Sequence, residues 1–383
     1  VPFIQGEYDV KELFAETVVP LVSGAAWMRS LNFQGAIRWA DYEGSGTIWS
    51  WKGGLDGQVT DQLRLRGTYS RDTRAGNMAE RFDRTGGAAN AVDRKQPGPG
   101  DPPIPDPANY GFTIVSGGNP NIKPETGDTI TVGLVYRPAW MNGLSMSVDW
   151  LKVSLKDAIE ALGVQDIIDL CYQQDDQDQC SRITREVGAD GIDRIIFVNS
   201  ARQNLGKSTY EGIDFELAWA RRVTLLGGDE RLSARLFGTY LIESSTTNYA
   251  GVKTETTGQV VSQNPRRRAN LNLGYNRNGF GWTLIGRYHG GGRNSIALNR
   301  EDANGTVATW NVADNHTGSS VYWDTRLFWR FNMGGGEVEV FGNVQNLFDR
   351  DPPWISTLEG VGQTAGGFDL IGRRYVAGIN LRF

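Results

Sequence analysis

The last stretch of the chain alternates in a way that constrains the fold more than any other feature. Alternate positions are occupied by Phe383, Leu381, Ile379, Ala377 and Tyr375, and most positions between them are polar or glycine. Successive side chains of a strand point to opposite faces, so this pattern predicts a strand with one apolar and one largely polar face. Similar segments recur upstream, which indicates a chain built mainly from such strands.

Composition excludes two classes of protein. The chain has 383 residues, a net charge of -5 and a hydrophobic fraction of 39%. We find no run of about 18 apolar residues, which excludes a transmembrane helix, and the acidic balance argues against a nucleic-acid binder. A mean hydropathy of -0.40 remains compatible with a transmembrane β-barrel, because alternation hides the lipid-facing residues from an average. The chain starts at Val1 without a leader, so we expect a mature product or a part of a longer protein.

The polar faces of the predicted strands carry Arg, Glu, Asp and Asn repeatedly. An Arg or Lys that faces lipid at the bilayer midplane costs roughly 2–4 kcal/mol, so we predict that these residues face a polar lumen. The strand segments number about thirteen. The predicted fold is therefore all-β, a transmembrane antiparallel β-barrel. Single-chain bacterial barrels have even strand numbers, so an odd count predicts at least one strand before the first.

Short turns alternate with long interruptions of the strand pattern, which is typical of periplasmic turns and extracellular loops. A short helix is expected at Ala158–Leu170, inside the second interruption, and the turn at 43–46 is a short exception on the outer side. The long extracellular loops are predicted at about 73–126, 158–205, 245–264, 291–320 and 349–370.

Five short segments of the chain are distinctive: RDTRAGNMAERF at 71–82, GNPNIKPET at 118–126, GIDFE at 212–216, NLFD at 346–349, and the terminus from Gly372 to Phe383. They resemble, in the same order, segments of TonB-dependent outer-membrane receptors. One departure is Gly76, where that family usually has proline, and we expect it to change loop rigidity.

This resemblance implies that residues 1–383 form the C-terminal part of a 22-stranded barrel in the outer membrane of a Gram-negative bacterium. The plug domain and the segment that contacts TonB are not in this sequence. The implied partners are the TonB complex, outer-membrane lipid and lipopolysaccharide, and the barrel-assembly machinery. In such receptors the terminal strand is part of the assembly signal, which here comprises Tyr375, Ile379, Leu381 and Phe383.

The two cysteines of the chain, Cys171 and Cys180, lie in a predicted extracellular loop. The oxidising compartment favours a disulfide, as in the loops of related receptors. A metal site is disfavoured because two thiolates alone bind zinc poorly.

Several residues are candidates for contacts with a ligand or with the plug, and each also has a purely structural interpretation. Arg74, Asn77 and Glu80 belong to the first family segment and are favoured as residues that shape the strand exit. Arg266 and Arg268 form a basic cluster that suits either an anion or a solvated face. The aromatic rings of Trp310, Tyr322 and Trp354 suit either stacking on a ligand or packing in loops and girdles.

No catalytic constellation is apparent in the sequence. His289 and His316 are the two histidines, and no segment supplies a base with an orienting acid, a metal-ligand cluster or a phosphate-binding loop. The leading hypothesis is a receptor that imports a siderophore, cobalamin, haem or oligosaccharide with energy supplied through TonB, without a cofactor. A passive porin and a soluble β-rich binding module are the alternatives. The family segments fit the porin poorly, and in a soluble module the repeated Arg and Asp on one face, with aromatics on the other, lack an explanation.

Overall fold

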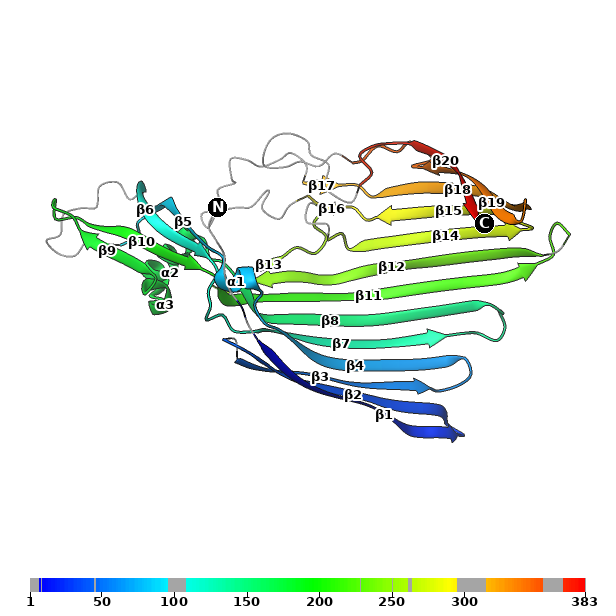
Figure 1. Cartoon of the computed structure of the whole chain (residues 1–383), viewed down its shortest axis with the longest axis horizontal. Coiled ribbons are helices and arrows are strands. Elements are labelled where there is room, and N and C mark those ends of the chain that lie inside the picture. Colours follow the sequence, from blue (N-terminus) through cyan, green and yellow to red (C-terminus); the bar gives the residue numbers. More distant parts are fainter. Residues whose placement is uncertain are drawn as a thin grey trace.

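The strand pattern of the sequence folds into one large antiparallel sheet. The computed structural model describes residues 7, 9–44, 46–95, 108–227, 229–249, 251–260, 264–294, 315–353 and 368–382. Hydrogen bonds link thirteen strands in the order β1-β2-β3-β4-β7-β8-β11-β12-β14-β15-β18-β19-β20, with the short β13 added beside β12. The sheet curves from β1 at one edge to β20 at the other (Figure 1). The predicted fold class, an antiparallel barrel-type sheet, is confirmed.

The strands of this sheet have the following bounds: β1 Val10–Ala25, β2 Met28–Tyr42, β3 Gly46–Gln58, β4 Leu63–Arg74, β7 Glu125–Tyr136, β8 Leu144–Glu160, β11 Gln203–Val223, β12 Glu230–Thr247, β13 Lys253–Glu255, β14 Arg267–Arg277, β15 Phe280–His289, β18 Ser320–Met333, β19 Gly336–Gln345 and β20 Arg374–Arg382. A further two-stranded ladder pairs β16 Gly292–Arg293 with β17 His316–Thr317.

One face of the sheet exposes large apolar side chains. Val132 on β7 is 55% exposed, and its register partner Trp150 on β8 lies on the same face. On β20 the apolar face is exposed as the alternation predicts, at Tyr375, Ile379 and Leu381, while Phe383 lies outside the described residues. A contiguous apolar surface of this extent needs an apolar surrounding, and a bilayer supplies it for a barrel wall.

A second, smaller unit lies beyond one end of the sheet and is called the lobe here (Figure 1). It contains a four-stranded sheet in the order β5-β6-β10-β9. Its strands are β5 Arg84–Val92, β6 Ala108–Gly117, β9 Ile183–Val187 and β10 Asp193–Ala201, with the helices α2 Val164–Gln174 and α3 Gln177–Cys180. The lobe thus comes from within two segments, 73–126 and 158–205, that the sequence predicts as loops.

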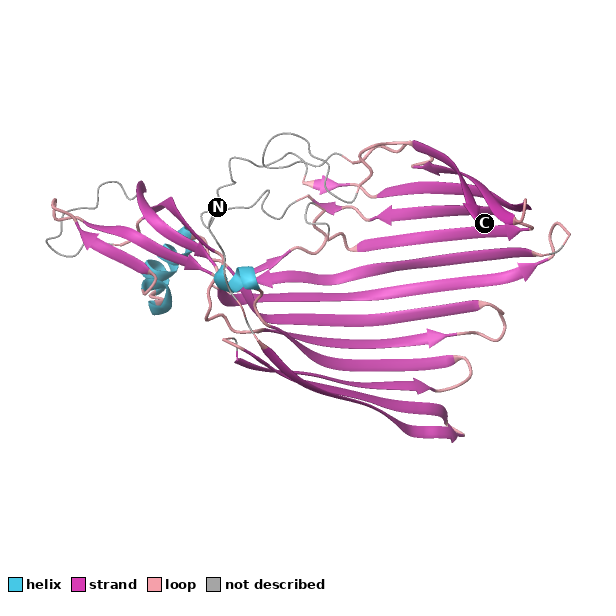
Figure 2. Ribbon diagram, in the orientation of Figure 1, coloured by secondary structure: helices cyan, strands magenta, loops and turns pink. Residues whose placement is uncertain are grey.

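The lobe has a buried apolar core of its own. Phe112 from β6, Ile167 and Ile168 from α2, and Ile195 and Val198 from β10 pack together at 0–5% exposure. The expected helix at 158–170 is corrected, because β8 continues to Glu160 and α2 begins only at Val164. Figure 2 shows two of the three described helices in the lobe and α1, Met78–Phe82, beside the junction with the sheet. No helix among the described residues is long and apolar enough to cross a membrane.

Candidate functional site

The polar face of the sheet carries cross-strand ion pairs. Arg66 on β4 reaches over β7 to Asp149 on β8, with Nε–Oδ1 and Nη2–Oδ2 distances of 2.8 and 2.7 Å. The residue between them is Gly133, where a Cβ would lie 1.9 Å from Asp149 Oδ1, so the absence of a side chain makes room for this bridge. Arg235 on β12 is likewise bound to Glu216 on β11.

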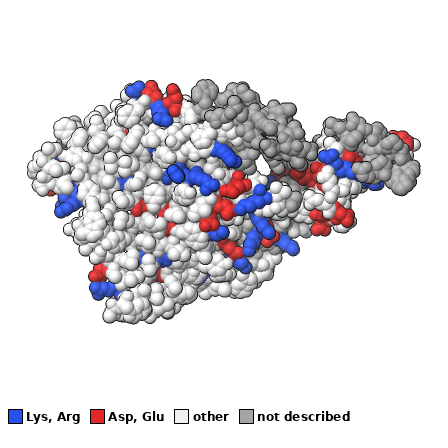
Figure 3. All heavy atoms as spheres, turned by 180° about the vertical axis from the view of Figure 1, so that it is seen from behind, with Lys and Arg blue, Asp and Glu red and all other residues white. Residues whose placement is uncertain are grey.

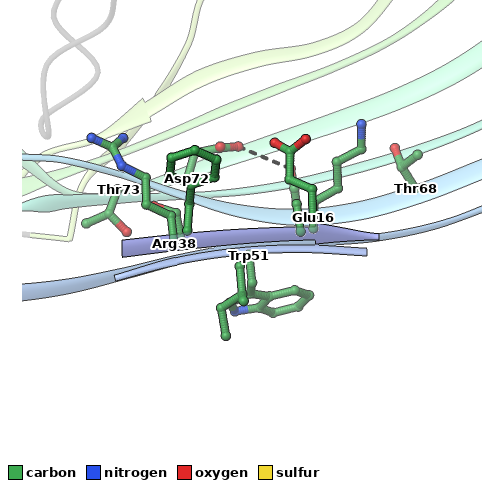
Figure 4. Close-up of a pocket in the computed structure, with 12 residues that line it drawn as sticks. Glu16, Arg38, Trp51, Thr68, Asp72 and Thr73 are labelled. Carbon is green, nitrogen blue, oxygen red and sulfur yellow. Dashed lines mark hydrogen bonds between the residues drawn. The ribbon is translucent and has the colours of Figure 1, made fainter. Parts of the chain in front are cut away.

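A hollow of about 560 Å³ lies against this face at β1 to β4. Figure 4 shows Glu16, Arg38 and Thr68 rising from one side of the ribbons, and Trp51 pointing to the other. Arg38 is bound to Glu12, and Ser70 donates to Asp72 at 3.1 Å. The wall therefore offers donors and acceptors of both signs beside apolar side chains such as Phe14 and Ile37, which suits a polar ligand or a protein surface.

The first family segment lies where β4 leaves the sheet, and its polar residues bind one another. Arg74 donates to Glu125 at 2.6 Å and to Glu80 at 2.8 and 3.0 Å. Asn77 and Glu80 form a capping box on α1, because each side chain accepts from the other's backbone N–H at 2.8 Å. Burial alone would raise the pKa of Glu80, but the bonds from Arg74 and from the N–H of Asn77 lower it.

Lack of space for a side chain explains why position 76, the departure from the family pattern, is glycine. A Cβ at this position would lie 2.4 Å from Cδ1 of Ile122, which is 2% exposed. Ile122 belongs to the second family segment. The two family segments are therefore packed tightly against each other at the rim of the sheet, and a larger residue at 76 would displace Ile122.

Ion pairs fasten the residues after β5 to the rest of the lobe. Arg185 on β9 binds Asp93 at 2.8 Å, and the Asp93 side chain is 1% exposed. Lys95 binds Asp193, and Arg94 binds Asp169 on α2 at 2.9 Å. Burial raises the pKa of Asp193, but the bonds from Lys95 and Arg185 outweigh this and lower it.

The side chain of Asn204 joins the lobe to the sheet. Its Oδ1 accepts from the N–H of Lys123 at 2.7 Å, while Nδ2 donates to the carbonyl oxygens of Lys123 and Asp157 at 2.7 and 2.9 Å. Tyr249, after β12, donates its hydroxyl to Asp176 at the start of α3. At the base of the lobe, Asn204 thus joins the segments that contain Lys123 and Asp157, and Tyr249 adds a separate bond to Asp176.

A disulfide links Cys171 on α2 to Cys180 on α3, with a Cα–Cα distance of 4.7 Å. Closing a loop over a sequence separation of nine residues stabilises by about 2–3 kcal/mol in the chain-entropy account. We expect reduction to speed the cleavage of 164–182 by trypsin at Arg182, without cleavage in the strands of the large sheet. A Cys171→Ser, Cys180→Ser double variant should match the reduced protein, and equal cleavage rates before and after reduction would contradict this expectation.

The family described as "TonB dependent receptor-like, beta-barrel" matches residues 3–347. The chain belongs to this family. No curated protein matches the sequence. The presence of a TonB-dependent receptor barrel places the chain in the outer membrane of a Gram-negative bacterium, as the sequence predicts.

Solved receptors share this fold at low sequence identity. The siderophore receptor PirA from Acinetobacter baumannii has a TM-score of 0.63 and 18% identity, over 98% of this chain and 46% of that one. A mutant of the ferric enterobactin receptor PfeA from Pseudomonas aeruginosa has a TM-score of 0.63 and 16% identity, over 98% and 45%. The outer membrane transporter YddB from Escherichia coli has 0.58 and 12%, over 92% and 43%. The chain spans less than half the length of these receptors.

In the receptor barrel, a band of charge marks the end of the apolar face that lies toward the lobe. Lys152 follows Trp150 by two positions on β8 and therefore shares its face; it binds Glu211 at 3.0 Å. Asp128 on the same face of β7 binds Arg71 at 2.7 Å and Lys156 at 3.3 Å. Figure 3 shows a face that is largely free of charge, with both signs gathered toward the end that bears the lobe. Aromatic residues followed by charges are typical of a membrane boundary.

The remaining predicted contact residues that the structure describes lie on or next to β14 and β18. Arg266 lies 3.8 Å from Glu255 and donates to the carbonyl oxygen of Ile242 at 3.4 Å. Arg268 on β14 is paired in register with His289 on β15. Tyr322 on β18 is 1% exposed, so its ring packs and does not present a surface. Trp310 and Trp354 lie outside the described residues.

The sequence interpretation missed the lobe and its fastening residues, Asp93, Arg185 and Asn204. The sequence does contain one signal for the lobe. Ile195, Phe197 and Val198 lie close together in a short apolar run, which forms β10. Such a run within a long loop is evidence for a strand with a partner. The partner, β6, pairs with β10 in parallel from Thr113 to Gly117, and pairing at that sequence distance leaves no local pattern.

Proposed function

We propose that the protein containing this chain is an outer-membrane receptor that binds a scarce extracellular ligand and imports it with energy supplied by the TonB complex. The observation that carries the proposal is the charged inner wall of the sheet. At one end this wall is continuous with the lobe, which is a folded unit in segments predicted as loops. The family is one of transport receptors, which supports transport over catalysis. Energy coupling would require contacts with the TonB complex, which the receptor family implies.

A ferric siderophore is the proposed ligand class. PirA is a siderophore receptor and PfeA a ferric enterobactin receptor by their descriptions, and one PfeA structure contains enterobactin. At 16–18% identity these likenesses concern the fold, so cobalamin, haem and oligosaccharides remain as other cargo of the same architecture. The mixed donors and acceptors of the hollow at β1 to β4 accept any of these polar ligands.

The test is uptake by cells that produce the full receptor. We expect accumulation of radioactive iron, supplied as a ferric siderophore, to fall at least about tenfold when TonB is removed, because a plugged barrel passes no large solute passively. The receptor should also be induced by iron starvation. Uptake that persists without TonB would contradict the proposal, and a steady conductance in planar bilayers would indicate a passive pore instead.

Two further partners are proposed from position in the membrane. The band of Arg71, Lys152 and Lys156 lies where the phosphate groups of lipopolysaccharide would be met, and each of these cations is also paired with an acidic residue. The terminal strand, with Tyr375, Ile379 and Leu381 on its exposed apolar face, suits the signal read by the barrel-assembly machinery.

A further inference from the structure

A second hollow, of about 390 Å³, lies at the base of the lobe. Segments from three parts of the lobe contribute to it: the start of β5, the loop after β6, and the stretch from the end of α3 to β10. Its lining consists of two arginines, polar uncharged residues and one alanine, namely Arg84, Asn119, Asn121, Ser181, Arg182, Asn199 and Ala201. None of these lining residues is acidic.

The two arginines differ from the other arginines of the lobe. Arg94, Arg185 and Arg194 each form an ion pair with an aspartate. Within the described part of the chain, neither Arg84 nor Arg182 has a carboxylate oxygen within 4.0 Å. The Nε–H of Arg182 is buried without a hydrogen-bond partner, and that of Arg84 donates only a long bond, 3.3 Å, to the carbonyl oxygen of Gly118.

The electrostatics of Arg182 favour binding of an anion beside it. Burial lowers its pKa, and the charge of Asp178 on α3 opposes this only in part. A guanidinium that is half-buried without a counter-ion is costly, and an oxyanion within reach would offset that cost.

One amide group of the hollow, that of Asn199, is oriented to donate. Oδ1 of Asn199 accepts from the N–H of Ala201 at 3.1 Å, so its NH₂ group is left to face a ligand. Asn119 is different, because Nδ2 donates to the carbonyl oxygen of Arg202 at 2.9 Å and Oδ1 accepts from Asn121 N–H. Its two bonds hold the loop that carries Asn121, which lines the same hollow.

We propose that this hollow binds an oxyanion, a carboxylate or phosphate group, between the guanidinium groups of Arg84 and Arg182 and the amide of Asn199. Bidentate geometry suits arginine to both kinds of group. The volume is within the range of small-molecule sites, so a solute with several such groups fits. The proposed site concerns only binding to the lobe. It does not depend on TonB-driven import, so either proposal can fail without the other.

The test is calorimetric titration of the whole purified receptor, in detergent, with citrate and separately with inorganic phosphate. We expect saturable binding of citrate at one site, which weakens as salt is raised. Arg182→Gln should weaken it about tenfold or more, the effect of losing one charge-assisted hydrogen bond. The matched control is Arg194→Gln, which removes an arginine from the same lobe outside the hollow and should change the affinity less than twofold.

A second variant keeps the test decisive if Arg182→Gln folds poorly. Asn199→Asp retains the acceptor for Ala201 N–H but places a carboxylate beside Arg182, so it should abolish citrate binding in a folded lobe. The absence of saturable binding of both probes to the unaltered receptor would overturn the proposal. The proposal would also be overturned if Arg182→Gln and Asn199→Asp bound citrate with affinities within twofold of that of the unaltered receptor. Displacement of citrate by lipopolysaccharide, but not by its dephosphorylated form, would identify a membrane phosphate as the source; without displacement the source is a dissolved ligand.

Discussion

Arginine at position 148 should destabilise the inserted barrel by about 2–4 kcal/mol, whereas arginine at position 147 should cost less than about 1 kcal/mol. Val148 on β8 is 43% exposed and pairs with Leu134 and Phe215, all on the apolar face. A guanidinium there must enter hydrocarbon. Ser147 faces the other way, on the polar face, and pairs in register with Glu216. The strand, its depth in the membrane and the introduced residue are nearly identical, so the comparison isolates the face.

The measurement is urea unfolding of the receptor refolded into lipid vesicles, followed by the heat-sensitive mobility of folded barrels in gels. Val148→Ala is the control for lost packing, and it should cost much less than Val148→Arg. Equal losses for the arginine variants at 147 and 148 would mean that neither face meets lipid. A larger loss at 147 would reverse the assignment of lumen and membrane for the whole sheet.

The large sheet was predictable from the sequence because its cause is local. Each strand repeats with period two, and one face must meet lipid while the other meets water, so Leu217 and Glu216 alternate on β11 without reference to any distant residue. The count of about thirteen strands follows from the same rule. Strand ends were less predictable, since β8 and β11 continue beyond the membrane into segments predicted as loops, to Glu160 and from Gln203.

The lobe was not predictable because its contacts are distant in the sequence. Ile168 on α2 and Phe112 on β6 belong to one core although more than fifty residues separate them in the sequence, and no periodic pattern predicts such a pairing. At the rim, the residue types of the first family segment suggested a role in shaping the strand exit. The partner Glu125, which binds Arg74 from another segment, is fixed by the fold alone. The reason for glycine at position 76 is likewise visible only in the folded structure, where Ile122 occupies the space that a side chain would need.

Loss of the Asp93 carboxylate should open the lobe while leaving the large sheet intact. The side chains of Asp93 and Arg185 are 1% and 14% exposed, so Asp93→Asn leaves a buried guanidinium without its closest counter-ion. Breaking one partner of a buried pair typically costs about 3–5 kcal/mol. Arg185 Nε lies 3.2 Å from Asp193, and that remaining carboxylate should bring the loss to the lower end. We expect amide hydrogen exchange in β9, β10 and α2 to accelerate by about 10²-fold.

The control is Asp190→Asn in the turn between β9 and β10. Asp190 binds Arg194 at 2.6 Å, but its side chain is 50% exposed, and exposed pairs contribute at most about 1 kcal/mol. Exchange in the lobe should therefore change little. If Asp93→Asn and Asp190→Asn change the exchange rates equally, the lobe is held together by its apolar core and its ion pairs contribute little. If Asp93→Asn also accelerates exchange in β8 and β11, the lobe and barrel unfold together, and Asn204 joins them into one cooperative unit.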